Sequence, residues 1–481
     1  MAIRPPAAAL AALLVALFPA QPRPPAPSID LDAAGRVSAD RLRRTVRELV
    51  ALGSRMGGTP SGDRAAGYVE AAFRRLGLPA RVVRDPDVLA YWTDGWSLEI
   101  VPSGAAIESA WPYVYSPAVA PARTAPLAAA DRIEAAADAA GRAVYTPAPV
   151  TAAAYDTLAR AETAPALVIT SAPDDPKKNL DYARLGSLPG GARAAIPVFA
   201  VSYVDGRTLM AAAADGASVR FLIEARTRRA PPLTVLAELG GRQPGRYYLL
   251  CAHGDSDSGG PGADDNASSV AVVLEVAAVL HGLVRDGRLP PPRAGIRFAI
   301  WGAEYHSARA YVAREGKALA DLAGVINLDQ TGTGAEREAV YFESNDVPWN
   351  GPLLRVFEAI GRAYRGREGF WPDYATTPSQ GGTDAYVFLP EAYKGEGAAD
   401  RRIPATTVYT AAWDAPVRLK QTPGWDVPGA RDPTTVVVDY SLYYHSSGDT
   451  PANTTEREPQ NMVRAARAVV LALLRLAWRE G

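Results

Sequence analysis

After Leu233 the chain alternates between short apolar runs and segments with helical spacing. The runs typical of buried strands are 247–252, 296–301, 324–328 and 404–409, and the helical segments are 268–280, 308–322 and 353–364. Strands that alternate with helices favour a sheet with parallel neighbours, because each helix returns the chain across one face of the sheet. We therefore predict an α/β domain, a three-layer α/β/α sandwich with a mixed, mostly parallel sheet.

The length of the chain, 481 residues, exceeds that of one ordinary compact domain, so we expect a second lobe or an insert. Between residues 95 and 230 short β-like runs alternate with loops rich in Gly, Pro and Ala, which predicts a small β-rich inserted domain. Helical segments at 38–52 and 61–76 come before it. The predicted organisation is a leader at 1–26, the N-terminal part of the main domain at 30–94, the insert at 95–230 and the remainder of the main domain at 231–481.

The first residues predict export from the cytoplasm. Arg4 precedes an apolar run at 7–18, which has about the length of a signal peptide and is too short to span a bilayer. A Pro-rich stretch follows. We predict a cleaved secretory signal peptide and a periplasmic or extracellular protein with no transmembrane segment in its mature chain. The alternative is an uncleaved anchor at the membrane interface, because Phe18-Pro19-Ala20 is a poor cleavage sequence.

Charge, cysteine content and missing motifs favour no other class of protein. The net charge is -1, with acidic and basic residues evenly interspersed, which favours neither nucleic acid nor an anionic membrane surface. The single cysteine, Cys251, cannot form an intrachain disulfide and is predicted to be a small buried hydrophobic residue. The chain has no serine-hydrolase elbow, no H-E-x-x-H helix and no phosphate-binding loop of the Walker type. These features select no oligomeric state.

Side chains that can bind a metal follow the predicted strands. They are His253 and Asp255 after the first run, Glu304 after the second and Asp329 after the third. Sites in open α/β sheets form where loops leave the carboxyl ends of strands. The loop 262–266 adds two carboxylates, and His445 adds an imidazole. A single Asp at such a place is more often a helix cap or a loop hydrogen-bonder, but the set taken together predicts a metal site.

This ligand set fits hydrolysis assisted by two metal ions. Imidazole nitrogen and carboxylate oxygen bind zinc at about 2.0–2.2 Å, and one carboxylate can bridge two ions roughly 3.5–4 Å apart. Such a pair acidifies a bound water, polarises a carbonyl group and anchors a free amino group. A separate carboxylate must accept the proton of the water and pass it to the leaving amine. Glu304 is the natural candidate for this catalytic base.

Six motifs together resemble the co-catalytic zinc aminopeptidase family. The motifs are His253-Gly254-Asp255, Gly262-Ala263-Asp264-Asp265-Asn266, Gly302-Ala303-Glu304, Asn327-Leu328-Asp329, Gly382-Thr383-Asp384 and Tyr444-His445. The family includes bacterial leucyl aminopeptidases, glutamate carboxypeptidase, the glutaminyl cyclases and the catalytically dead transferrin receptor. The resemblance covers 234–475 well and 38–80 more loosely, and it implies the zinc exopeptidase fold and peptide substrates. The insert resembles the protease-associated domain of such enzymes.

The resemblance also implies a role for each residue of the site. His253 and Asp329 would hold one zinc ion, His445 would hold the other, and Asp265 would bridge the two. Asp255 would not bind zinc itself but would contact His253 and orient it, which fixes the tautomer of the ligating ring. The remaining residues implied to surround the ligands are Asp264, which would shape the backbone before the bridge, and Asp384 and Tyr386.

The segment at Glu304 departs from the family pattern. The family usually has two adjacent glutamates here, the first as base and the second as a ligand to the metal of His445, whereas Tyr305 takes the second place. Three interpretations compete: His306 supplies a nitrogen ligand, Tyr305 binds as a phenolate, or one catalytic zinc remains with an open position. In a fourth interpretation, Tyr305 and His306 simply pack against or cap the following helix.

A second departure is Ala385, because the family often has His or Tyr there to hold the transition state, and Tyr386 could replace that group. The sequence therefore predicts an exported zinc metallopeptidase, first of all an aminopeptidase, with two zinc ions or one. The alternative is a mono-zinc or non-catalytic relative that acts as a binding or receptor-like protein.

Overall fold

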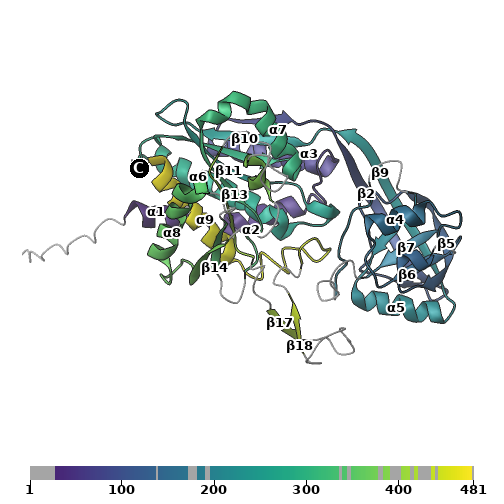
Figure 1. Ribbon diagram of the computed structural model, residues 1–481. Helices are drawn as coiled ribbons and strands as arrows, with labels where there is room; N and C mark the ends of the chain where they lie inside the picture. The colour runs from purple at the N-terminus through teal and green to yellow at the C-terminus, as the bar shows by residue number, and fades with distance from the viewer. Residues whose placement is uncertain are drawn as a thin grey trace, which may run out of the picture.

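The computed structural model describes residues 28–136, 139–171, 181–189, 195–334, 339–343, 348–377, 383–389, 402–411, 417–420, 435–438 and 443–478. The predicted leader at 1–26 lies outside these residues. The described chain forms a larger lobe and a smaller lobe, which are joined by two long strands (Figure 1).

The larger lobe is built on a mixed sheet of eight strands in the order β1-β10-β12-β11-β13-β16-β14-β15. The strands are β1 Ala80–Arg84, β10 Leu233–Leu239, β11 Tyr247–His253, β12 Gly295–Trp301, β13 Leu322–Leu328, β14 Ala339–Glu343, β15 Asp373–Thr377 and β16 Ala405–Tyr409. The central strands β12, β11, β13 and β16 run parallel, and antiparallel pairs join them to the strands on either side. The four strands predicted from the sequence are these central four.

Helices cover both faces of this sheet. On one face lie α1 Ile29–Gly35, α2 Ala39–Val50, α3 Pro60–Leu76, α6 Ser269–Arg285, α8 Gly351–Tyr364 and α9 Gln460–Leu473, and on the other lie α7 Glu304–Glu315 and the short turns η5 Gly316–Asp321 and η7 Asp384–Phe388. Alternate residues of β11 enter the two cores: Leu250 packs with the first set of helices, and Leu249 and Cys251 pack with the second. This arrangement confirms the predicted α/β fold.

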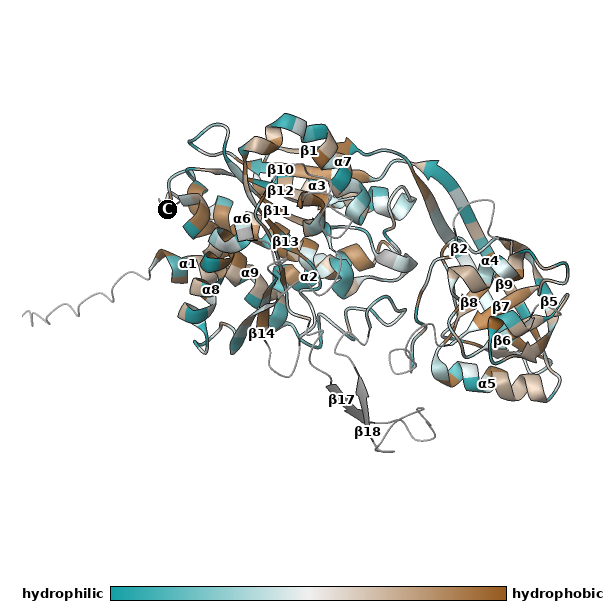
Figure 2. Ribbon diagram, viewed as in Figure 1, coloured by the Kyte–Doolittle hydropathy of each residue, from teal (hydrophilic) through white to brown (hydrophobic). Residues whose placement is uncertain are grey.

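The segment Ala263–Arg285, which joins η4 (Ala263–Ser268) to α6, is the one helix among the described residues that is long and apolar enough to cross a membrane. Most of that helix is buried inside the larger lobe. A helix that is apolar on every side either spans a membrane or fills a core, and burial accounts for its composition here. Figure 2 shows the same distribution in the sheet, where β11, β12 and β13 are brown and the outer surfaces of the lobe carry more teal.

The smaller lobe contains a second sheet in the order β3-β2-β9-β5-β6-β7-β8-β4. Its strands are β2 Val88–Val101, β3 Ala105–Ala106, β4 Trp111–Pro112, β5 Val119–Ala129, β6 Ala143–Thr146, β7 Leu167–Thr170, β8 Val198–Ala200 and β9 Ser218–Ala230, and its helices are α4 Ala152–Ala159 and α5 Tyr203–Ala214. Strands β2 and β9 pair antiparallel along their whole length and connect the two lobes (Figure 1). We call residues 88–230 the insert lobe.

Two predicted helices begin earlier than expected. Helix α3 starts at Pro60 with the Thr59 side chain as its cap, because Thr accepts the free amide of Gly62 and Pro suits the first helical position. Helix α7 starts at Glu304 instead of 308 and ends at Glu315. The carboxylate of Glu304 therefore lies in the first turn, where free N–H groups favour a negative charge.

The core around α6 gives a stability prediction. Leu280 in α6 is fully buried, whereas Leu31 in α1 is 44% exposed. We expect Leu280→Ala to lower the free energy of unfolding by about 2–5 kcal/mol, because it removes buried methyl groups and leaves a cavity. The control Leu31→Ala should change it by less than about 0.5 kcal/mol. Urea denaturation followed by circular dichroism measures both, and equal effects would contradict this assignment of the core.

Candidate metal centre

The sheet brings His253 and Asp329 to the same edge. His253 is the last residue of β11, and Asp329 directly follows β13. The two strands are parallel neighbours in which Cys251 pairs with Asn327, so His253 and Asp329 lie level with each other two residues further on. Asp265 comes from η4 (Ala263–Ser268), the irregular turn that leads into α6. Three segments distant in sequence thus meet at the carboxyl ends of the strands.

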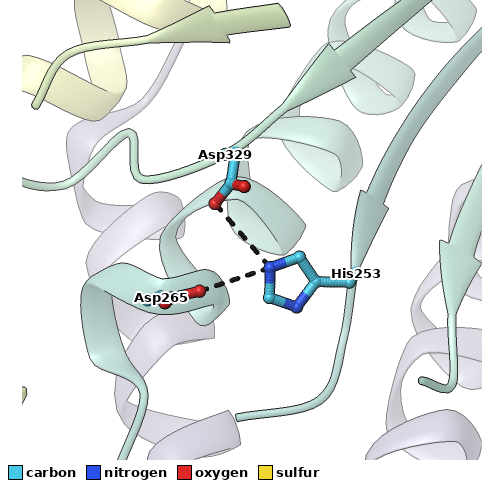
Figure 3. Close-up of side chains that lie close together, drawn as sticks. All are labelled: His253, Asp265 and Asp329. Carbon is cyan, nitrogen blue, oxygen red and sulfur yellow. Dashed lines mark ion pairs between the residues drawn. The ribbon is translucent and has the colours of Figure 1, made fainter. Parts of the chain in front are cut away.

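The three side chains point towards one another, as Figure 3 shows. Nε2 of His253 lies 3.2 Å from Oδ1 of Asp265 and 3.7 Å from Oδ1 of Asp329. Ligands about 2.0–2.1 Å from a tetrahedral zinc ion are roughly 3.3–3.4 Å apart, which is close to both distances. Oδ1 of Asp329 is buried and accepts no hydrogen bond from the described residues. The donor set therefore fits a zinc ion.

Asp265 also reaches His445. Oδ2 of Asp265 lies 3.2 Å from Nε2 of His445, so the two oxygens of one carboxylate face two different imidazoles. Burial opposes ionisation of Asp265, but hydrogen bonds with His253 and His445 outweigh it and hold the pKa of the carboxyl well below its usual range. A carboxylate that stays ionised between two imidazoles has the geometry that a bridging ligand requires.

Asp255 orients both His253 and the start of α7. Oδ1 of Asp255 lies 3.2 Å from Nδ1 of His253 and accepts the backbone N–H of Glu304 at 3.1 Å. Burial lowers the pKa of His253, but the nearby carboxylates of Asp255, Asp265 and Asp329 raise it well above its usual value. With Nδ1 directed at Asp255, Nε2 faces the other two carboxylates, which is the orientation expected of a zinc ligand.

Asp329 is held by a hydroxyl that the sequence analysis did not single out. Thr383 donates its Oγ1–H to Oδ2 of Asp329 at 2.8 Å, and Nδ2 of Asn327 donates to the same Oγ1 at 2.8 Å. Asn327 is fixed in turn beside the buried thiol of Cys251, 3.5 Å away. Thr383 belongs to the motif Gly382-Thr383-Asp384, which indicated that this segment lies near the site. Nothing in the sequence, however, linked the Thr383 hydroxyl to Asp329.

Two further carboxylates hold the backbone around Asp265. Asp264 accepts hydrogen bonds from the amides of Gly332 and Thr333 and from the Thr333 hydroxyl, at 2.6–3.1 Å. Burial raises the pKa of Asp264 to about 7 despite these bonds. Asp449 accepts the amides of Asp264 and Asp265 with its two oxygens, at 2.8 and 3.0 Å. Asp449 was not predicted, although it lies four residues after His445.

A buried arginine fixes the loop that carries Asp255. The Arg55 guanidinium donates to the carbonyl groups of Gly254, Pro261 and Gly262 at 2.6–3.2 Å. Burial lowers its pKa to about 10, and the charge of Asp449 is the largest opposing influence. Arg55 therefore remains a cation at neutral pH next to the cluster of carboxylates. Arg55 lies in a turn-rich segment of the sequence, and no pattern in that segment predicts its contacts with residues about 200 positions away.

Glu304 lies next to the same group of carboxylates, because its backbone N–H donates to Asp255. Burial raises the pKa of its carboxyl well above 4.5, His253 opposes that shift, and the charge of Asp384 adds to it. Asp384, in η7, is fully buried, and neither of its oxygens accepts a hydrogen bond from the described residues. Burial also raises the pKa of Asp384 well above its usual value. The protonation of Glu304 and of Asp384 therefore depends on the charges of the groups bound in the site.

The structure shows contacts of Tyr305, His306 and Tyr386 that the sequence did not predict. Nε2 of His306 meets the backbone carbonyl of Pro86 at 2.7 Å. Tyr305 packs against Tyr386 in a small apolar cluster that also contains Trp349 and Leu389, and the Tyr386 hydroxyl donates to Oε1 of Glu343. The contact of His306 with Pro86 agrees with the fourth interpretation for that residue, in which its side chain packs or caps instead of binding zinc. Among the described His, Cys, Asp and Glu residues, no third side chain groups with His445 and Asp265 at the proposed second zinc position.

Known proteins resemble the chain in both sequence and fold. Residues 234–470 match the model of peptidase family M28. An aminopeptidase of Pseudomonas aeruginosa is 26% identical over 237 residues, which cover 45% of this chain and 41% of that protein. Leucine aminopeptidase 2 of Trichophyton equinum is 25% identical over 289 residues, 57% of this chain and 52% of that protein. The chain spans about half the length of these curated relatives.

Solved structures extend the likeness in fold to nearly the whole chain. A zinc aminopeptidase from Bacillus subtilis superposes with a TM-score of 0.59 at 20% identity and covers 92% of this chain and 96% of its own. A peptidase M28 precursor from Shewanella amazonensis gives 0.64 at 17% identity, with 94% and 96% covered. The fold is that of the co-catalytic zinc peptidases. Residues 234–470 match peptidase family M28 within that class, as the motifs predicted.

The contact between Thr383 and Asp329 gives a prediction for metal affinity. Thr383→Val removes the hydroxyl that orients Asp329, and we expect zinc to bind about 10- to 100-fold more weakly. Thr407→Val is the matched control, because the Thr407 hydroxyl is also buried but has no hydrogen-bond partner among the described residues. Competition with a chromogenic chelator measures both affinities. Equal affinities in the two variants would show that Thr383 does not orient the ligand.

Proposed function

We propose that this chain is an exported zinc aminopeptidase. One observation carries the proposal: the Asp265 carboxylate lies between Nε2 of His253 and Nε2 of His445, at 3.2 Å from each. His253, Asp265 and Asp329 would hold the first zinc ion, and Asp265 and His445 would hold the second. The names of the relatives support an aminopeptidase, and the predicted leader supports export. A probable lipoprotein aminopeptidase of Mycobacterium tuberculosis is 31% identical over 156 residues.

The residues of the chain would divide the work of hydrolysis. Bound zinc would supply an acidified water and a polarised peptide carbonyl group. Glu304 would accept the proton of the attacking water on its carboxylate and donate it to the leaving amine nitrogen. The backbone N–H of Glu304 donates a hydrogen bond to Asp255, the same residue that orients His253. Asp384 is buried, and a cation bound nearby would favour its ionised form.

The ligand count predicts two zinc positions of unequal strength. The first position has three protein ligands, whereas the described His, Cys, Asp and Glu residues supply two at the second, because His306 hydrogen-bonds to the carbonyl of Pro86. After dialysis against metal-free buffer we expect one zinc ion per chain by elemental mass spectrometry, and a second on titration with zinc. Two ions retained after dialysis would show that a further ligand completes the second position.

Glu304 provides the test that separates an enzyme from a binding protein. With leucine p-nitroanilide as probe, we expect Glu304→Gln to lower kcat by about 10²–10⁴-fold, because the amide cannot accept a proton, while zinc content stays unchanged. Glu238→Gln, an exposed acid on β10, is the control and should keep full activity. A wild-type chain that binds zinc but hydrolyses no aminoacyl substrate would favour the alternative, a receptor-like relative without turnover.

A further inference from the structure

One segment of the insert lobe extends to the metal centre. We call residues 182–188 the contact segment. Within the insert lobe it is held by two backbone hydrogen bonds, from Val114 to the carbonyl of Gly186 and from Leu188 to the carbonyl of Val114, each 2.9 Å. Leu185 and Leu188 are buried in the same apolar cluster as the strands of that lobe. The contact segment is therefore anchored in the insert lobe.

The other side of the contact segment pairs with the residues around His445. Leu185 donates its backbone N–H to the carbonyl of His445 at 2.8 Å, and Ser447 donates to the carbonyl of Ala183 at 2.9 Å. Between these bonds, Arg184 and Ser446 form an antiparallel bridge. A short two-stranded pairing thus joins the insert lobe to the backbone of a proposed zinc ligand.

Arg184 strengthens this contact through its side chain. The side chain is largely buried, its Nη1 donates to the carbonyl of Tyr444, and its guanidinium lies 5.2 Å from the centre of the Tyr444 ring. The Tyr444 ring stacks on the imidazole of His445, with centroids 3.6 Å apart. Arg184 therefore contacts the aromatic ring that stacks on the imidazole of His445.

The backbone of His445 needs such support. Its φ is +49°, a left-handed conformation that residues other than glycine adopt rarely and that persists where surrounding contacts impose it. The pairing with Ala183 and Leu185 supplies such contacts at the carbonyl of His445 and at the amide of Ser447. The interface is also tight, because a side chain at Gly448 would come within 2.6 Å of the Tyr182 ring.

We propose that the insert lobe positions His445 for the second zinc ion, and that Arg184 is the positioning residue of this contact. The inference rests on the proposed function, because it assumes that His445 binds zinc. It gives the insert lobe a role inside the metal centre in addition to any cover that it provides. Because coupling between two binding events is reciprocal, zinc at the second position should also strengthen the pairing of the contact segment with residues 443–448.

The test compares zinc binding in matched variants of the full chain. We expect Arg184→Ala to weaken binding of the second zinc ion by about 10- to 100-fold and to leave the first unchanged, since Arg184 acts through His445 alone. Arg184→Lys keeps the donor to the Tyr444 carbonyl and should recover part of the affinity. Arg160→Ala, which removes an exposed arginine from the same lobe, should bind both ions as the wild type does.

Hydrogen exchange gives a readout that does not depend on activity. In the wild type, saturating zinc should slow amide exchange in peptides that cover 182–188 and 443–448, and Arg184→Ala should lose most of that protection while its circular dichroism stays native. The inference would be overturned if Arg184→Ala bound the second zinc ion as tightly as the wild type does. It would also be overturned if zinc did not change amide exchange in residues 182–188 of the wild type.

The reference variant His445→Ala separates this inference from the proposed function. If His445→Ala loses the second ion and Arg184→Ala keeps it, the zinc centre stands and the role of the insert lobe is refuted. If the wild type takes up one ion only and His445→Ala changes nothing, His445 is not a ligand and both proposals for the second position fail. Loss of the second ion in both variants supports the inference.

Discussion

The structure around the site depends on one electrostatic constraint, the burial of many carboxylates in a small volume. Asp264, Asp265, Asp384 and Asp449 are all buried close to one another, and isolated buried charges are unfavourable unless they are paired or hydrogen-bonded. The chain meets the constraint in three ways: two imidazoles face Asp265, backbone amides satisfy Asp264 and Asp449, and the buried cation of Arg55 lies nearby. Oδ1 of Asp329 and both oxygens of Asp384 accept no hydrogen bond from the described residues, and a bound cation would stabilise their ionised forms.

The same contacts explain why distant segments must fold together before the site exists. Arg55 ties the N-terminal part of the larger lobe to the loop after β11, and Asp449 ties the C-terminal part to the turn before α6. The contact segment adds the insert lobe through the backbone of His445. Three regions separated by hundreds of residues thus support ligands only a few ångströms apart. Folding and formation of the site are therefore closely linked in this chain.

Much of the fold and part of the site could be read from residue patterns. The strands β11, β12, β13 and β16 were predicted because buried parallel strands are continuous apolar runs, and their carboxyl ends were expected to carry His253, Glu304 and Asp329. Other residues of the site were missed. Thr383, Asp449 and Arg55 act through hydrogen bonds to partners far away in sequence, and neither spacing nor composition records such partners.

The sequence by itself determined the fold class, the family and the identity of the candidate ligands, because periodicity and strand-end chemistry are local properties. The tertiary structure decided what local patterns leave open. It directed His306 to Pro86, so the described His, Cys, Asp and Glu residues supply two ligands, Asp265 and His445, at the second position. It also brought the insert lobe against His445. Both outcomes depend on how separate segments approach one another in space, and that approach is set by packing of the whole chain.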